Sequence, residues 1–188
     1  MNGVIETIKN RRSVRAYEKK EIPQEIIEKI VEAGDAGPSG ANMRPWRFVV
    51  VKSSEMIKKL QNTAIPFYKN WIEGVDGKLK EIRKEIDSKV EDSIYYDAPL
   101  IIFVVGTKVL AYESDCAMVC QNMMLAARSM DIGSCWVHFG QFGLSEEIKA
   151  EFEISENEKV FGPIVFGYPK DGVFPEEKSK EKSKINWK

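Results

Sequence analysis

The residues from Lys9 to Glu18, KNRRSVRAYE, concentrate basic side chains around a serine. Guanidinium groups pair with phosphate oxygens, and the hydroxyl of Ser13 can donate a further hydrogen bond to such a group. Arg11 and Arg15 are spaced so that they would share one face of a helical turn. The cluster is therefore either a binding site for a phosphate-bearing ligand or a solvated charged face, which is the more common outcome at a helix end.

A second polar segment, PSGANMRPW, covers Pro38–Trp46. Its glycine, serine and asparagine residues offer backbone N–H groups and short polar side chains at close range. This combination suits a flat polar heterocycle or a sugar chain. The alternative is an ordinary connection between a helix and a strand, with Trp46 as its anchor in the core.

These two segments must be positioned by a folded core, and hydrophobic periodicity predicts its elements. We expect helices over residues 3–12, after Pro23, after Ser53 or Ser54 and over 115–130, and strands over 47–51, 100–106, 133–138 and 160–167. The elements mix without regular βαβ units, which favours an α+β layered domain over a doubly wound sheet. We therefore expect a single domain over residues 1–188.

Three segments carry expectations about surfaces. The helix over 115–130 is apolar on nearly all sides, so it should be buried in the core or against another subunit. Residues 66–96 alternate lysine and glutamate with scattered aromatic residues and should form a mostly helical, exposed excursion. The tail over 170–188 is charged and of low complexity, so it must dock on another surface or stay mobile.

Composition and missing motifs exclude several classes of function. The 28 basic and 29 acidic residues argue against nucleic-acid binding. The longest apolar run, 99–106, is too short for a membrane span, and the start lacks the apolar core of a signal peptide, so we expect a soluble cytoplasmic protein. Three cysteines without a CxxC pair and one histidine predict no metal site, and His138 is expected in a strand with a satisfied ring. The dinucleotide-binding glycine fingerprint, the phosphate loop and the common hydrolase motifs are missing from the sequence.

Four stretches in order along the chain resemble the motifs of the FMN-dependent nitroreductase family. They are RRSVRAY (11–17), PSGANMRPW (38–46), IGSCWV (132–137) and FGYP (166–169). The resemblance implies a central mixed, mostly antiparallel sheet flanked by helices, in an intertwined homodimer. One FMN would sit in each of two sites at the dimer interface, built from both subunits.

The resemblance also assigns residues to the cofactor site. It implies that Arg11 pairs with the FMN phosphate, that Ser13 bonds the phosphate or the ribityl chain, and that Arg15 lies toward the ribityl chain and the N1/O2 edge of the ring. The other residues that it implies are Arg12 between them, the loop residues Pro38, Ser39, Gly40 and Asn42 from the partner subunit, and a C-terminal lysine among Lys178, Lys180 and Lys182. Arg44 stands where many family members have glutamine.

The function that the resemblance implies is the reduction of nitroaromatic, quinone or similar small acceptors with hydride from NAD(P)H in a ping-pong cycle. The flavin carries the electrons, so no catalytic acid, base or nucleophile is needed, and Arg15 would tune the flavin as a fixed cation. Residues 66–96 would cover the substrate. The alternatives are another flavin reaction on the same scaffold (dehalogenation, flavin fragmentation or azoline oxidation), a flavin-binding sensor or storage protein without turnover, and a basic patch that binds an acidic partner.

Overall fold

The computed structural model describes residues 3–75, 77, 93–176 and 183–188. The helices are α1 (Gly3–Asn10), α2 (Gln24–Asp35), α3 (Ser54–Glu73), α5 (Tyr112–Ser129) and α6 (Glu146–Glu151), with short 3-10 turns η1 (Gly40–Asn42), η2 (His138–Gly143) and η3 (Lys170–Gly172). The strands are β1 (Trp46–Val51), β2 (Leu100–Thr107), β3 (Gly133–Trp136) and β4 (Glu158–Gly167). Pro23, expected in the first turn of α2, is its N-cap residue, and Ser53 caps α3 as predicted by accepting a hydrogen bond from the Met56 N–H.

The four strands form one sheet in the order β1-β2-β4-β3, and all three ladders are antiparallel. The α+β class with a mostly antiparallel sheet is confirmed, and the parallel pairing described is an isolated bridge between Ser13 and Ser134. Strand β2 was expected to be buried on both faces. It is: Phe103 belongs to the apolar cluster on one face of the sheet, and Ile102 and Val104 belong to the cluster on the other.

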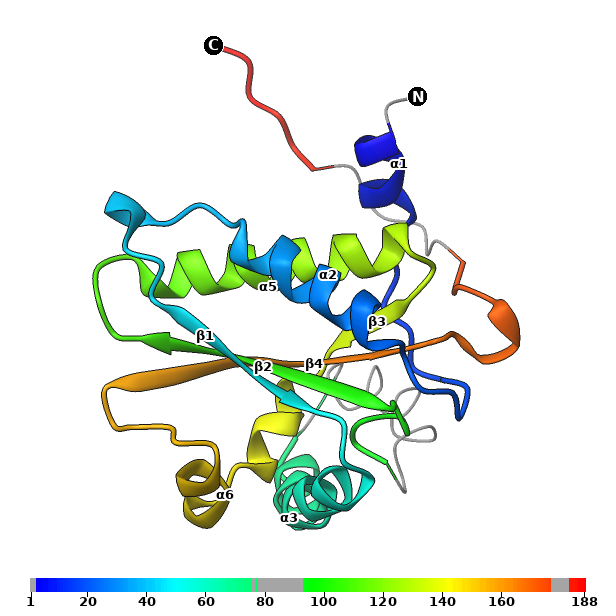
Figure 1. Ribbon diagram of the computed structural model, residues 1–188, viewed down its shortest axis with the longest axis vertical. Coiled ribbons are helices and arrows are strands. Elements are labelled where there is room, and N and C mark those ends of the chain that lie inside the picture. The colour runs from blue at the N-terminus through cyan, green and yellow to red at the C-terminus, as the bar shows by residue number, and fades with distance from the viewer. Residues whose placement is uncertain (1–2, 76, 78–92, 177–182) are drawn as a thin grey trace.

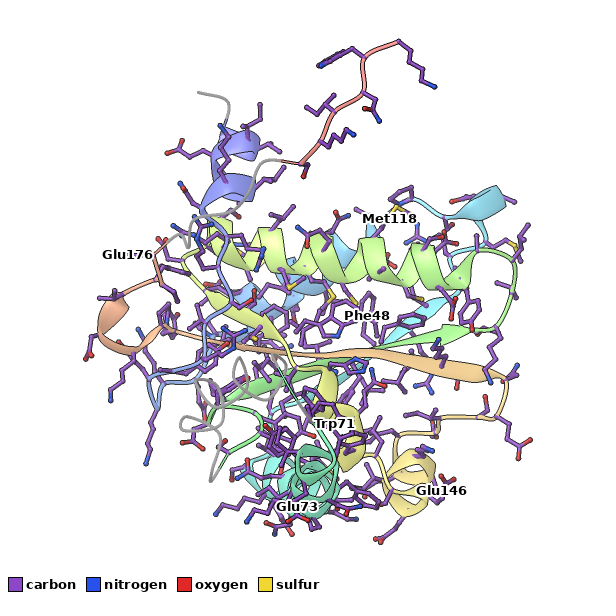
Figure 2. The ribbon with its side chains drawn as sticks, turned by 180° about the vertical axis from the view of Figure 1, so that it is seen from behind. Phe48, Trp71, Glu73, Met118, Glu146 and Glu176 are labelled. Atoms are coloured by element: carbon purple, nitrogen blue, oxygen red, sulfur yellow. The ribbon has the colours of Figure 1, made fainter. Side chains whose placement is uncertain are left out.

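Helices cover both faces of the sheet, so the molecule has three layers (Figure 1). Helices α2 and α5 pack together on one face, and α3 and α6 lie on the other. Figure 2 shows Phe48 in the layer between the sheet and α5, where it packs against the cluster that contains Ile102 and Val104. Trp71 lies on the α3 side and packs against the cluster that contains Phe103.

The segment that carries the arginines is attached along the β3 edge of the sheet. The Val14 N–H donates to the Ser134 carbonyl at 3.0 Å, and Tyr17 forms an isolated bridge with Pro169, just after β4. A side chain at Gly133 would place its Cβ 2.8 Å from Val14, so glycine is what permits this close approach. The sheet edge therefore fixes the path of the chain from Ser13 to Tyr17.

Helix α5 is buried on one side only. The side chains that face the core are Cys116, Val119, Cys120, Met123, Met124 and Ala127. Ala117 and Gln121 are exposed, and Met118 keeps 39% of its surface exposed on the side away from the sheet (Figure 2). The core of a single chain therefore buries only one face of this helix, which rules out the first of the two alternatives, and burial of the other face against another subunit stays a prediction.

Two local expectations are also corrected. The third strand ends at Trp136, and His138 begins η2 as an exposed residue against the Phe139 ring, so it is not a strand histidine. Residues 93–95 are buried rather than exposed, because Tyr95 packs in the core and donates its hydroxyl to the Gly140 carbonyl at 2.7 Å. Helix α3 continues to Glu73 as expected, whereas residues 76 and 78–92 lie outside the described residues.

The two chain ends expose apolar side chains. Helix α1 contributes no buried residue, and its apolar residues Val4, Ile5 and Ile8 are exposed. In the described part of the tail, Trp187 is 89% exposed. Both views show α1 and residues 183–188 standing out beyond α5 (Figures 1 and 2). Of the helices that the structure describes, none combines the length and apolarity that crossing a membrane requires.

Candidate functional site

Arg11, Ser13 and Arg15 converge on Cys135 of β3. Burial raises the pKa of the Cys135 thiol, while the charge of Arg15, a hydrogen bond with Ser13 and the charge of Arg11 oppose that rise. Ser13 forms an isolated parallel bridge with Ser134, and the Val14 N–H donates to the Ser134 carbonyl, so this segment of the chain runs beside Cys135. The structure therefore brings three of the predicted residues to one place on the sheet edge.

The Nε atom of Arg15 is buried and has no hydrogen-bond partner within the described part of the chain. Its surroundings include Tyr17: burial raises the pKa of the Tyr17 hydroxyl, Cys135 and Tyr96 add to that rise, and the charge of Arg15 opposes it. A buried guanidinium N–H without an acceptor is unfavourable. The Nε–H of Arg15 is thus available to an acceptor from outside the described part of the chain.

Arg12 is engaged differently from its neighbours. Its Nη1 donates to the backbone carbonyls of Lys9 at 2.5 Å and Arg11 at 2.8 Å. These carbonyls lie at the C-terminal end of α1, where the helix itself supplies no partners. Part of the donor capacity of Arg12 therefore serves to end the helix.

The second predicted segment forms a loop with an unusual backbone. The φ angles are positive at Ala41 (51°), Asn42 (56°) and Arg44 (46°). This left-handed conformation is uncommon for residues other than glycine, although asparagine tolerates it well. Such residues persist only where the surrounding structure holds them, and they are concentrated in ligand-binding loops and active sites.

Two aspartates hold this loop at its two ends. The buried carboxylate of Asp115, in the first turn of α5, accepts a hydrogen bond from the Gly40 N–H at 3.1 Å. Asp35, at the end of α2, forms an ion pair with Arg44 and accepts a hydrogen bond from Trp46 Nε1 at 3.0 Å. The hydrogen bonds from Trp46 and Arg44 hold the pKa of Asp35 below its ordinary value.

The predicted loop residues and the predicted arginines are held by different elements of the fold. The loop residues Ser39, Gly40 and Asn42, with Pro38 before them, are anchored on α2 and α5, whereas the arginines lie against β3. Two surface hollows, of about 560 and 620 Å³, lie over α6 and along β1, and neither is lined by any of these residues. Lys178, Lys180 and Lys182 fall outside the described residues.

Sequence reasoning missed the residues behind the site. Cys135 was seen only as part of the IGSCWV stretch, and Asp115 only as the start of an apolar helix. A clue was available for Asp115, because an aspartate preceding a run of apolar helical residues is costly to bury unless it has a partner. For Asp35 the clue was weaker: it stands beside the glycine-rich loop, where Arg44 is the unusual residue.

This chain is similar to known proteins in both sequence and fold. The sequence model of the nitroreductase family matches residues 8–168, which includes both segments. The crystal structure of a nitroreductase with bound FMN from Bacteroides fragilis NCTC 9343 superimposes with a TM-score of 0.78. It is 34% identical and covers 99% of this chain and 98% of its own.

Two curated relatives differ in the reactions that their names give. A protein of Methanothermobacter thermautotrophicus, provisionally named NADH dehydrogenase/NAD(P)H nitroreductase, is 33% identical over 88% of this chain and 77% of its own length. Mouse iodotyrosine deiodinase 1 is 26% identical over 96% of this chain and 67% of its own length.

Proposed function

This chain belongs to the nitroreductase family, and from that premise we propose that it is an FMN-dependent oxidoreductase. The proposed reaction takes a hydride from NAD(P)H and reduces nitroaromatic, quinone or similar small acceptors. The observation that carries the proposal is the convergence of Arg11, Ser13 and Arg15, with a buried Arg15 Nε that finds no acceptor in the described part of the chain. The three buried free cysteines fit a reducing, cytoplasmic location, which is part of the same proposal.

The residues present fit FMN. Two guanidinium groups and a hydroxyl are the donors that a phosphate and a ribityl chain require, and Arg15 has an N–H available in a buried position. In the proposed site Arg11 and Ser13 hold the phosphate end, and Arg15 lies toward the ring. Pro38, Ser39, Gly40 and Asn42 line the ring, as the loop of a second chain.

We propose that the protein works as a homodimer. The outer face of α5 presents Ala117 and Met118 to solvent, and the apolar side chains of α1 are exposed. A second copy of the chain would cover these surfaces. The same copy would bring its loop, anchored on α5, to the arginines of the first.

Bound FMN supplies the hydride chemistry, and the chain binds, orients and tunes it. Arg15 stays charged at any working pH, so it is suited to stabilise negative charge near the ring. The buried surroundings of Arg15, which include Tyr17 and Cys135, strengthen that interaction because they exclude water. Residues 66–96 cover the acceptor in this proposal.

The first prediction concerns the cofactor itself. We expect the purified protein to carry FMN, or to bind it on reconstitution, and NADH or NADPH to bleach the flavin without oxygen. The cofactor is released by heating and identified by chromatography, and bleaching is followed in the visible spectrum. FAD, or no flavin after reconstitution, would overturn the proposal. Bound FMN that neither nucleotide reduces would favour a sensor or storage protein instead.

A second candidate activity is reductive dehalogenation. The similarity to mouse iodotyrosine deiodinase 1 over 96% of this chain favours it over the other flavin reactions. Chemically reduced holoprotein can be mixed without oxygen with a nitroaromatic compound or with a halogenated phenol. Faster reoxidation by the nitro compound supports the proposed function, and faster release of halide supports dehalogenation.

A further inference from the structure

Asp115 is a buried carboxylate outside the motifs that carry the resemblance. Its side chain is 2% exposed, and its Oδ2 accepts a hydrogen bond from the Gly40 N–H at 3.1 Å. Burying a charged carboxylate is costly unless polar partners compensate. The compensation here comes from that N–H and from the position of Asp115 in the first turn of α5, where the helix dipole favours negative charge. The cost of burying Asp115 indicates that its carboxylate has a structural role.

Asp115 holds the loop that contains the residues with positive φ angles. Gly40 immediately precedes Ala41 and Asn42, which both have positive φ angles. This conformation is unfavourable for the isolated chain, so external contacts must keep the loop in place. The bond from Gly40 to Asp115 fixes the loop to α5 at the point where the run of residues with positive φ angles begins.

The contact at the other end of the loop is weaker. The Asp35 and Arg44 side chains are 50% and 48% exposed, so water and salt screen their ion pair. The Asp115 carboxylate is buried and Gly40 is partly exposed, so solvent weakens this hydrogen bond less than it weakens the ion pair of Asp35 and Arg44. Asp115 should therefore hold the Gly40 end of the loop more firmly than Asp35 holds the Arg44 end.

We infer that Asp115 is a positioning residue for the cofactor: it holds the loop 39–44 in its binding conformation before FMN arrives, without touching FMN. This inference rests on the proposed function, since it assigns the loop to the FMN site. Preorganisation raises affinity because the binding energy need not order the loop. Removal of the Asp115 carboxylate, which accepts from the Gly40 N–H, should therefore lower the affinity for FMN.

The experiment compares three variants of the full-length holoprotein with the wild type. Asp115→Ala removes the acceptor, whereas Asp115→Asn keeps a carbonyl oxygen in the same position. Cys120→Ala is the matched control, because Cys120 is equally buried in α5 but lies away from the loop. The dissociation constant for FMN is measured by fluorescence titration, together with the thermal midpoint and the mass in solution.

We expect Asp115→Ala to weaken FMN binding about ten- to a hundredfold. Asp115→Asn should recover most of that loss. Cys120→Ala should lower the thermal midpoint through the cavity that it leaves and bind FMN like the wild type. Unchanged affinity in Asp115→Ala overturns the inference. So does an equal loss of affinity in Cys120→Ala, or a loss in Asp115→Ala that appears only when the protein becomes a monomer.

A measurement on the wild type keeps the test valid if Asp115→Ala does not fold. Hydrogen exchange at the Gly40 amide should be slow in the apoprotein and change little when FMN is added, because the bond exists beforehand. A Gly40 amide that is protected only after FMN is added overturns the inference while the proposed function stands. Failure of the wild type to bind FMN overturns both.

Discussion

At the scale of the residue, Arg11 and Arg15 share a location but not an environment. Both act on the Cys135 thiol, yet it is Arg15 whose buried Nε has no hydrogen-bond partner among the described residues. A cation that is buried beside a ring system interacts with it through a lower dielectric than one at a solvated phosphate. The two arginines should therefore differ in what they contribute, with Arg11 serving binding and Arg15 serving both binding and tuning.

Substitution separates these contributions. Arg11→Ala should weaken FMN binding by about one to two decades, the equivalent of a hydrogen bond to a charged group, and leave the flavin potential nearly unchanged. Arg15→Ala should weaken binding and also lower the two-electron potential by about 30 mV, if the cation favours the reduced anion by about 1.4 kcal/mol. Dye equilibration at saturating FMN measures both potentials.

Two further variants sharpen that comparison. Arg15→Lys should keep much of the potential while losing the fork geometry. Arg12→Ala should disturb the end of α1 more than the potential, because Arg12 donates to the Lys9 and Arg11 carbonyls. Equal shifts in the flavin potential for Arg11→Ala and Arg15→Ala would contradict the division of roles. If neither substitution changes the affinity for FMN or the potential, the arginine cluster is only a solvated charged face.

At the scale of the element, an ion pair joins the β1 edge strand to β4 across the central strand. Arg47 pairs with Glu158 through two hydrogen bonds of 2.8 and 3.0 Å and also donates to the Phe152 and Glu153 carbonyls. The hydrogen bond from Arg47 is the main reason that the pKa of Glu158 falls from 4.5 to about 2. The Glu158 side chain is only 11% exposed, so solvent screens this pair less than a surface pair.

This pKa shift predicts how stability depends on pH. A carboxyl with a lowered folded-state pKa stabilises the fold fully above its unfolded pKa of 4.5, and this contribution is lost as pH falls toward about 2. Glu158→Gln should therefore destabilise the protein by about 1–3 kcal/mol at pH 7, with a smaller difference from the wild type at pH 3. Urea unfolding at the two pH values measures both.

A matched control uses a surface pair on α6. Glu146 pairs with Lys149 while 90% of its side chain is exposed, so Glu146→Gln should change stability little at either pH. An equal effect of the two substitutions, or a Glu158→Gln effect that does not shrink in acid, would show that the Arg47 pair does not stabilise the fold through the charge of Glu158.

The elements also show where sequence reasoning works and where it stops. The strand around Phe103 and the cap at Ser53 were predicted because the pattern that defines each is local. The end of β3 at Trp136 and the burial of Tyr95 were not, because both depend on packing against η2. The motifs found Arg11 and Arg15, but no local pattern joins either of them to Cys135.

At the scale of the whole molecule, the single chain leaves several apolar surfaces open on one side. One of these surfaces is the outer face of α5 itself. The others, the exposed side chains of α1 and Trp187, lie farther from the sheet than α5. The sequence of α5 could not distinguish a core helix from an interface helix, since both are apolar. The structure shows one buried face and one exposed face, and this favours an interface on the second.

A charge placed on that face should break the dimer. Ala117→Glu puts a carboxylate on the exposed face of α5, where it would have to be buried against the other subunit. Ala150→Glu, at an exposed alanine of α6 in the opposite layer, is the matched control. Light scattering at micromolar concentration should give a monomer mass for Ala117→Glu and a dimer mass for the control and the wild type.

A wild-type monomer that retains FMN would contradict the homodimer. A dimeric Ala117→Glu would place the interface elsewhere on the surface.

The separate anchoring of the arginines on β3 and of the loop on α5 has a genetic consequence. If each site takes its arginines from one copy and its loop from the other, a chain defective at Arg15 and a chain defective at Asn42 can repair one another. In their mixed dimer one site would carry both defects and the other neither. Two loss-of-function alleles would then complement each other, with one working site in each mixed dimer, whereas two alleles with defects in the same segment would not.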